Sequence, residues 1–463
     1  MKDKYRTLIK DTFIFSLGSI GSKFILFFLV PLYTKCLTAE EYGTSDLLFT
    51  IAQIFIPIIS LDIFDSVIRF GLENRKNPEN VFKVAMYVWG GGAIVSLAII
   101  QITNIYAPIQ PWKWYLYLYI VSNILLSIEL NYLKVKGKNL LYSFVCIIQT
   151  LLLAVLNIVF LLMLKTGVSG YLLSNILACI AAIIAAFILG RLDKDICKGL
   201  FEKKLARHMI LYSTPLIFNN LAWWVIQSSD KVMIQFFVGT AQLGLYTVAT
   251  RIPSLINVIV SVFQQSWGIS AVIEIKKSNE DGFYSDVFSV FTCGIFCVSV
   301  ILNSIIKYFM RMYVSNEFYQ SWRFIPLLVC AAAFSAIAAY FGAIYGALKK
   351  SLNNMITTVF SGVLNIVVNL CLIPKIGVQG AVIGTSFSYI FLAFVRMKDC
   401  LRFVKFRFDT KVLIINSCLI LAHAGMITIN FFPWLISVCT ICLLVIFNQK
   451  TIQKFLIHLL RKV

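Results

Sequence analysis

Long apolar stretches separated by short polar segments dominate the pattern of hydrophobic and polar positions along the chain. A helix needs about 20 apolar residues to cross the hydrocarbon core of a bilayer. The pattern therefore predicts an all-α polytopic membrane protein with about 14 transmembrane helices. The expected helices are 12–34, 45–68, 82–105, 113–133, 140–164, 169–190, 208–237, 244–272, 285–306, 322–347, 353–373, 380–395, 411–429 and 434–448.

Short sequence echoes relate the first six helices to the next six. The echoing segments are Val155–Val159 with Val363–Val367, Lys165–Gly170 with Lys375–Gly380, and Thr38–Gly43 with Gly239–Gly244. Because six is an even number, both copies enter the membrane from the same side, which predicts parallel lobes related by a pseudo-two-fold axis along the membrane normal. We expect an N-lobe at 1–207, a C-lobe at 208–410, and two further helices with a basic tail at 411–463.

Composition and charge agree with a membrane protein. Hydrophobic residues make up 59% of the 463 positions and charged residues only 13%, whereas soluble domains carry about 25% charged residues. Most of the basic residues behind the net charge of +20 lie at both ends and in alternate loops, which places both termini in the cytoplasm. Nucleic-acid binding is not expected, since the sequence has no basic domain interleaved with aromatic residues.

Several common chemistries lack a motif in this sequence. No Walker A loop is present, so the chain is not expected to hydrolyse ATP by itself. The CxxC at Cys439 and Cys442 lies in an apolar stretch without a second pair, which favours buried thiols over a metal site. We therefore predict no metal and no cofactor, apart from a coupling H⁺ or Na⁺.

Ionisable residues inside the predicted helices are the first candidates for function, because a charge at mid-bilayer costs about 2.5–3.5 kcal/mol on insertion scales. Lys23, Arg69 and Arg251 form a predicted cationic path for a substrate diphosphate. Candidates for ion coupling or for ion pairs are Asp62, Asp65, Glu129, Asp230 and Lys231. Two alternatives stay open: Asp230 and Arg251 as a structural ion pair, and Arg69 as a residue that snorkels to lipid headgroups.

Prolines and tryptophans supply a second set of candidates. Pro215 and Pro253 interrupt two predicted helices and are expected to act as hinges. Trp223, Trp224 and Trp267 are candidates for stacking against sugar rings, with ordinary interior packing as the alternative.

Several of these residues occur in segments that resemble the signature of Wzx-type polysaccharide flippases, in the multidrug/oligosaccharidyl-lipid/polysaccharide (MOP) exporter superfamily. The segments are Tyr212–Leu216, Asn220, Trp223–Trp224, Ser229–Lys231, Leu243–Tyr246, Arg251–Pro253, Phe263–Trp267, Gly18, Pro31–Thr34, Glu41–Gly43 and Leu61–Phe70. The sequence departs from the family's Leu-Asp-Leu-Gly motif at Leu61–Phe64, so local packing there is expected to differ.

The resemblance implies a transporter rather than an enzyme. It would move undecaprenyl-diphosphate-linked oligosaccharide repeat units from the cytoplasmic to the outer leaflet of a bacterial plasma membrane, through a cationic cavity and by alternating access. Its implied partners are this lipid-linked glycan and membrane lipids, with a glycan polymerase and glycosyltransferases as further candidates. A multidrug or cation exporter on the same fold is the first alternative. A polytopic glycosyltransferase or polymerase is the second, although no long loop with catalytic acids supports it.

Overall fold

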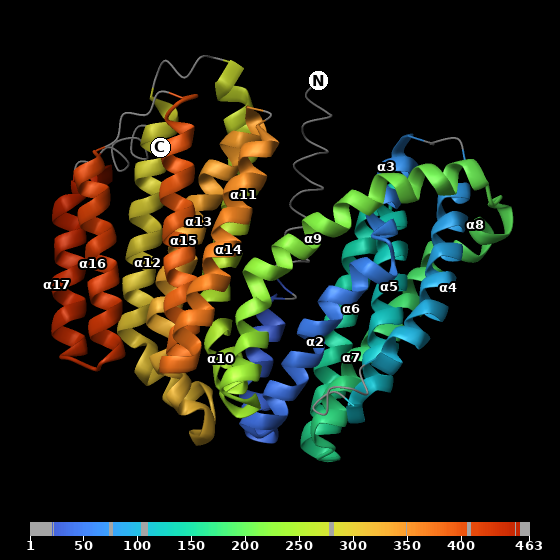
Figure 1. The fold of residues 1–463 in the computed structure, drawn as a ribbon, viewed down its shortest axis with the longest axis horizontal. Coiled ribbons are helices and arrows are strands. Elements are labelled where there is room, and N and C mark those ends of the chain that lie inside the picture. The colour runs from blue at the N-terminus through green and yellow to red at the C-terminus, as the bar shows by residue number, and fades with distance from the viewer. Residues whose placement is uncertain are drawn as a thin grey trace. The chain divides into compact units, whose positions relative to one another are not determined.

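A computed structural model shows a helical protein whose chain divides into two compact units, Met1–Val232 and Met233–Val463 (Figure 1). The structure describes residues 21, 23–73, 77–102, 110–276, 282–348, 350–404, 409–449 and 451–453, and it contains no strand in these ranges. The start of the predicted first helix, at residue 12, lies outside the described residues. Gly18 and most of the basic C-terminal tail lie outside them as well. The fold class predicted from the sequence is confirmed, whereas the predicted lobe boundaries stay a prediction.

Unit 1 begins with helical residues that run to position 36, followed by helices that are long enough to cross a membrane and by shorter pieces. These elements are α2 (Ala39–Ile59), α3 (Ile63–Glu73), α4 (Pro78–Ile102), η2 (Gln110–Trp112), α5 (Lys113–Val135), α6 (Asn139–Asn157), the π-helical η3 (Ile158–Met163), α7 (Gly167–Gly190), α8 (Leu192–Lys198) and α9 (Lys203–Phe237). The last residues of α9 belong to unit 2.

Unit 2 contains the remaining helices of the described chain. They are α10 (Thr240–Arg251), α11 (Pro253–Lys276), α12 (Phe283–Tyr313), η4 (Asn316–Arg323), α13 (Ile325–Ala347), α14 (Ser351–Ile376), α15 (Val378–Cys400), α16 (Thr410–Thr428) and α17 (Pro433–Phe447). Across the described parts of both units, 12 helical segments are long and apolar enough to span a bilayer, and Pro433–Phe447 is a shorter apolar helix. The chain is therefore a multi-pass membrane protein.

The second predicted span (45–68) and the eighth (244–272) are each divided between two helices. The second divides between α2 and α3, where Leu61 and Asp62 adopt left-handed backbone angles, with φ of 51° and 53°. Such angles strain residues other than glycine. The eighth divides at Ile252, just before Pro253 opens α11, because proline supplies no backbone N–H to continue α10. Equivalent spans of the predicted repeat therefore share an interruption.

The repeated Gly-Val-x-Gly motif has the same local role in both copies. Gly167 and Gly377 both adopt a positive φ, of 60° and 63°, which glycine takes without a steric penalty. Each stands at the start of the helix that follows, α7 or α15. Val168 and Val378, the next residue in each copy, are 6% and 4% exposed. The repeated motif thus supplies a glycine at the turn and a buried valine after it in both copies.

Candidate functional site

Polar side-chain contacts join α9 to the α2–α3 segment of unit 1 at successive points, in antiparallel order. At one end, the hydroxyl of Ser66 donates to the carbonyl of Met209 (2.9 Å). Further along, the indole of Trp224 donates to the carbonyl of Thr50 (2.9 Å). These contacts fasten the segment that resembles the flippase signature to the broken second span.

The middle contact joins the chain break to α9. The Asn220 amide donates to Asp62 Oδ2 (2.9 Å), and Asp62 is fully buried. The backbone N–H of Asp62 donates to the hydroxyl of Ser60 (3.1 Å), within the turn between α2 and α3. Within the described residues, Asp62 Oδ1 has no hydrogen-bond partner. The strained turn therefore presents a buried carboxyl that is only half satisfied.

A buried ion pair forms the contact nearest the start of α2. Lys231 Nζ lies 2.8 Å from Asp46 Oδ2, and their side chains are 19% and 9% exposed. The neighbouring Asp230 is 5% exposed, and its Oδ1 accepts the backbone N–H of Lys231 (2.8 Å). Lys231 is thus placed in an ion pair, one of the two roles predicted for it. The sequence analysis missed Asp46 because it lies near a helix end, where an acid is usually solvated.

Glu129 is a second buried carboxyl of unit 1. It lies in α5 and is 1% exposed, and its Oε2 has no hydrogen-bond partner within the described residues. A carboxyl removed from water without a partner is costly in its charged form. Glu129 and Asp62 are therefore the two predicted acids with a buried oxygen left to accept a proton.

Arg69 lies on the exposed part of α3. Its Nε is 2.9 Å from Glu73 Oε1, and both side chains are 56% exposed. The guanidinium also lies over the ring of Tyr212 in α9, 5.4 Å from the ring centre. Asp65, four residues earlier, is half-buried. An accessible guanidinium beside an aromatic ring can bind a phosphate group.

The other predicted cations lie apart in the chain. Lys23 is exposed on the first helix, and Arg251 is the last residue of α10. A cation at a helix C-terminus is stabilised by the helix dipole. Because Arg251 belongs to unit 2, whereas Lys23 and Arg69 belong to unit 1, the continuous cationic path stays a prediction.

The predicted hinges and tryptophans lie in different environments. Pro215 lies inside α9, and Pro253 is the first residue of α11. Trp223 is 40% exposed, whereas Trp267 is 2% exposed. The Trp267 indole stacks on the ring of Tyr340 with centres 4.3 Å apart and donates to the Tyr340 carbonyl (3.1 Å). Trp223 is thus the more accessible of the two.

Arg396 is a buried cation that the sequence analysis placed in a loop. Helix α15 continues to Cys400, five residues beyond its predicted end, and Arg396 within it is 4% exposed. The guanidinium donates to the hydroxyls of Thr357 (3.2 Å) and Thr358 (2.7 Å) on α14 and to the carbonyl of Ala338 (2.9 Å) on α13. It therefore joins three helices of unit 2.

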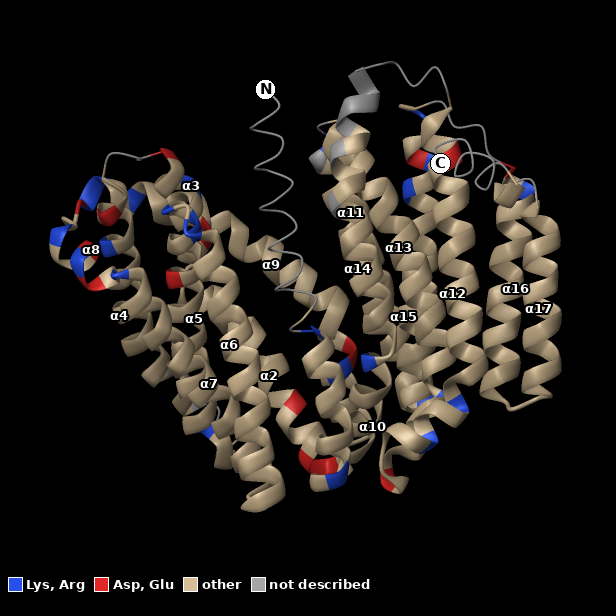
Figure 2. Ribbon diagram, turned by 180° about the vertical axis from the view of Figure 1, so that it is seen from behind, with Lys and Arg blue, Asp and Glu red and all other residues tan. Residues whose placement is uncertain are grey.

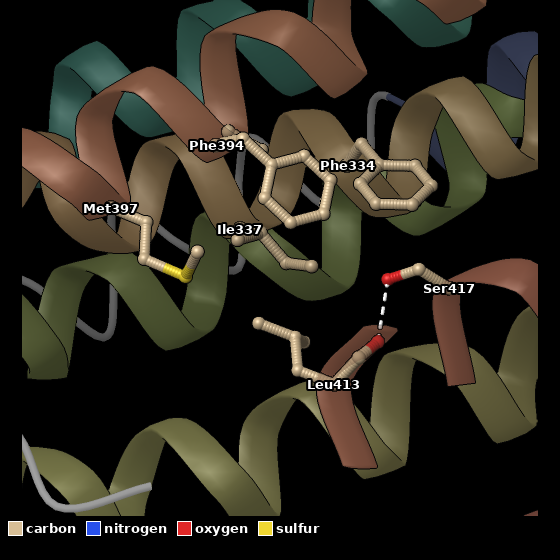
Figure 3. A pocket seen from close by; sticks show the side chains of 7 residues that line it. Phe334, Ile337, Phe394, Met397, Leu413 and Ser417 are labelled. Atoms are coloured by element: carbon tan, nitrogen blue, oxygen red, sulfur yellow. Dashed lines mark hydrogen bonds between the residues drawn. The ribbon is translucent and has the colours of Figure 1, made fainter. Parts of the chain in front are cut away.

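A small cavity in unit 2 is apolar (Figure 3). Its lining includes Phe334, Phe394, Met397 and Leu413. Ser417 supplies the polar side chain of the lining, and its hydroxyl donates to the Leu413 carbonyl (2.8 Å). No acid or cation lines this cavity, so it does not suit a diphosphate.

Comparison with known proteins places the chain in a family. The family model described as "Polysaccharide biosynthesis protein" matches residues 8–268, which is more than half of the chain. The chain belongs to this polysaccharide biosynthesis protein family. The match includes the whole of α2–α10 and the contacts of α9 described above. The resemblance predicted from the short motifs is thereby confirmed.

Two solved structures and one sequence relative are similar to this chain. The chain has the fold of the lipid II flippase MurJ in its inward closed conformation, with a TM-score of 0.72 at 14% identity over 95% of this chain and all of that one. An inward-facing multidrug MATE transporter of the MOP superfamily aligns with a TM-score of 0.65 at 12% identity, over 84% of this chain and 94% of that one. An uncharacterized membrane protein of Haemophilus influenzae is 23% identical over 55% of this chain and 62% of its own length.

Proposed function

We propose that this protein is a flippase for polyprenyl-diphosphate-linked oligosaccharide repeat units. It would move them from the cytoplasmic to the outer leaflet of the bacterial plasma membrane, with both termini in the cytoplasm. The observation that carries the proposal is the family match over residues 8–268, which includes the α9 signature segment and its contacts. The fold shared with the MurJ lipid II flippase supports the same class of substrate.

The proposed binding site for the diphosphate begins at Arg69. Its guanidinium is accessible and lies over the Tyr212 ring, and arginine binds phosphate oxygens through several directed N–H donors. Lys23 and Arg251 would hold the diphosphate at later stages of transport. The glycan would stack on Trp223, the more accessible tryptophan, while the polyprenyl chain stays in the lipid.

An ion gradient would drive the transport, and a proton is the ion that the geometry favours. Asp62 and Glu129 are buried, and each keeps one carboxyl oxygen without a hydrogen-bond partner in the described structure. Asp230 and Lys231 already make the contacts given above. Proton uptake at Glu129 would remove a charge from the interior of unit 1, and proton uptake at Asp62 would also weaken its bond to Asn220.

Charge reversal of the proposed cations tests this function. The variants Arg69→Glu, Lys23→Glu and Arg251→Glu should each abolish glycan export in a strain that lacks its own flippase, at normal protein levels. The matched control is Lys307→Glu, which reverses a cation outside the proposed path. If all three variants export glycan as well as the wild type does, the cationic path is wrong.

The same fold in a MATE transporter makes drug export the second candidate. The buried acids Asp62 and Glu129 favour it, since acids are the usual partners of cationic drugs. Drug resistance on overexpression, without any rescue of glycan export, would replace the flippase by this alternative.

A further inference from the structure

The basic linker, residues 191–204 between α7 and the start of α9, is fixed to unit 1 by specific hydrogen bonds. Lys83 Nζ donates to the carbonyl of Ile196 (2.9 Å). The backbone N–H of Leu200 donates to Asn80 Oδ1 (2.9 Å). Both partners lie at the beginning of α4. The linker therefore presents its outer side chains from a defined surface.

This surface lies at the level where several spans of unit 1 end. The Lys138 ammonium donates to the carbonyl of Gly190 (2.8 Å), which joins the α5–α6 turn to the end of α7. Asn80 and Lys83 connect the same region to the start of α4. Helix ends of transmembrane segments lie at headgroup depth. The basic linker is therefore placed beside lipid headgroups.

Two of the three acids of the basic linker make specific contacts, whereas Asp193 and the linker's cations are exposed. Asp195 is paired with Lys136, and Glu202 Oε1 accepts from the Asn80 amide (2.6 Å). Figure 2 shows Lys and Arg gathered around α8 in unit 1. The exposed cations of this surface are Arg191, Lys194, Lys198, Lys203 and Lys204.

Apolar side chains accompany these cations. Leu200 and Phe201 are 69% and 49% exposed, and the ring of Phe201 lies 4.9 Å from that of Tyr87 on α4. Tyr87 is itself 58% exposed. Exposed aromatic and aliphatic residues flanked by lysines are typical of a segment that rests in a bilayer interface. An acidic soluble protein would leave these apolar groups without a partner.

We propose that the basic linker binds anionic phospholipids of the adjoining leaflet, with Lys198, Lys203 and Lys204 at the headgroups and Leu200 and Phe201 between the acyl chains. This lipid site lies outside the predicted diphosphate path. Its occupancy can be measured without transport, so the proposal and the flippase function succeed or fail separately.

Lipid retention by the full-length protein tests the proposal. Protein in mixed micelles with equal phosphatidylglycerol and phosphatidylcholine is examined by native mass spectrometry. We expect selective retention of phosphatidylglycerol, and a roughly fivefold loss of affinity for each of the changes Lys198→Gln, Lys203→Gln and Lys204→Gln. The control variant carries Lys307→Gln, Arg311→Gln and Arg323→Gln and should retain phosphatidylglycerol normally. An equal loss of phosphatidylglycerol in this control and in the variant that combines the three linker changes would overturn the proposal.

A photoreactive group identifies what the linker contacts in cells. Benzoyl-phenylalanine in place of Phe201 should yield lipid conjugates on illumination of intact membranes. Conjugates with a protein and none with lipid would show that the surface docks a protein partner, and would reject the lipid site. Phe201→Ser should weaken retention of both lipids while leaving the preference for phosphatidylglycerol unchanged.

Discussion

The two units bury different kinds of polar groups. Unit 1 buries the carboxyls Asp46, Asp62, Glu129 and Asp230, whereas no carboxylate is among the buried residues described in unit 2. Among its described residues, unit 2 instead buries the cation Arg396 among hydroxyls and carbonyls. A carboxyl can lose its charge by taking up a proton, but an arginine keeps its charge. Unit 1 thus buries carboxyls that can take up a proton, whereas the buried Arg396 of unit 2 keeps its charge.

The ion pair of unit 1 gives the largest expected effect. Lys231→Ala leaves the Asp46 carboxylate buried without its cation and should cost about 3 kcal/mol or more of stability. Thermal unfolding of the purified protein in detergent measures the loss. The swapped variant, Asp46→Lys with Lys231→Asp, should recover part of it. A single variant as stable as the wild type would show that the pair contributes nothing.

The buried cation of unit 2 comes next. Arg396→Met removes hydrogen bonds to α13 and α14 and leaves their oxygens without a donor, which should cost about 2–3 kcal/mol. Arg396→Lys keeps the positive charge but not the several directed N–H donors of the guanidinium. Its stability should therefore lie between that of the Arg396→Met variant and that of the wild type. Unfolding of all three proteins under one condition ranks them, and equal midpoints for Met and Arg would contradict the bridging role.

The sequence predicted the helical fold and most of the spans, because long apolar runs stand out in a single chain. Against about 14 predicted helices, 12 of the described segments are long and apolar enough to cross a membrane. The sequence did not predict the roles of Asp46 and Arg396. Asp46 lies seven residues into α2 and Arg396 four residues before the end of α15, where charged residues are usually solvated. Their burial depends on Lys231, Thr357 and Thr358, residues distant in sequence that only the tertiary structure brings close.

The buried carboxyls of unit 1 should affect function more than stability. Glu129→Gln removes the proton site but keeps a similar shape, so the change in stability should stay within about 1 kcal/mol, since no described bond to Oε2 is lost. Transport in proteoliposomes should then lose its response to an imposed proton gradient. Asp193→Asn, which neutralises an exposed acid of unit 1, is the control and should leave the response intact. If the Glu129→Gln variant still responds to the proton gradient, Glu129 is not the coupling acid.

The paired glycines Gly167 and Gly377 offer the finest comparison between the units. Alanine at either position must adopt a positive φ. At Gly377, where ψ is −143°, it would also enter a region that is nearly exclusive to glycine, at a cost of about 1–3 kcal/mol. At Gly377 the added methyl would find its nearest neighbour in a Val238 methyl at 3.8 Å, whereas at Gly167 it would lie 2.9 Å from Glu41 Oε1.

Glu41 completes the capping box of α2, where its other oxygen accepts the N–H of Thr38 (2.9 Å). Moving this side chain would weaken the cap, which is typically worth about 1 kcal/mol. Gly167→Ala should therefore lower the unfolding midpoint through both backbone strain and the cap, whereas Gly377→Ala acts through backbone strain alone. In a Glu41→Ala background the effect of Gly167→Ala should shrink, because the cap is then already lost, while the effect of Gly377→Ala should stay the same. An effect of Gly167→Ala that does not depend on Glu41 would show that the added methyl leaves the cap intact.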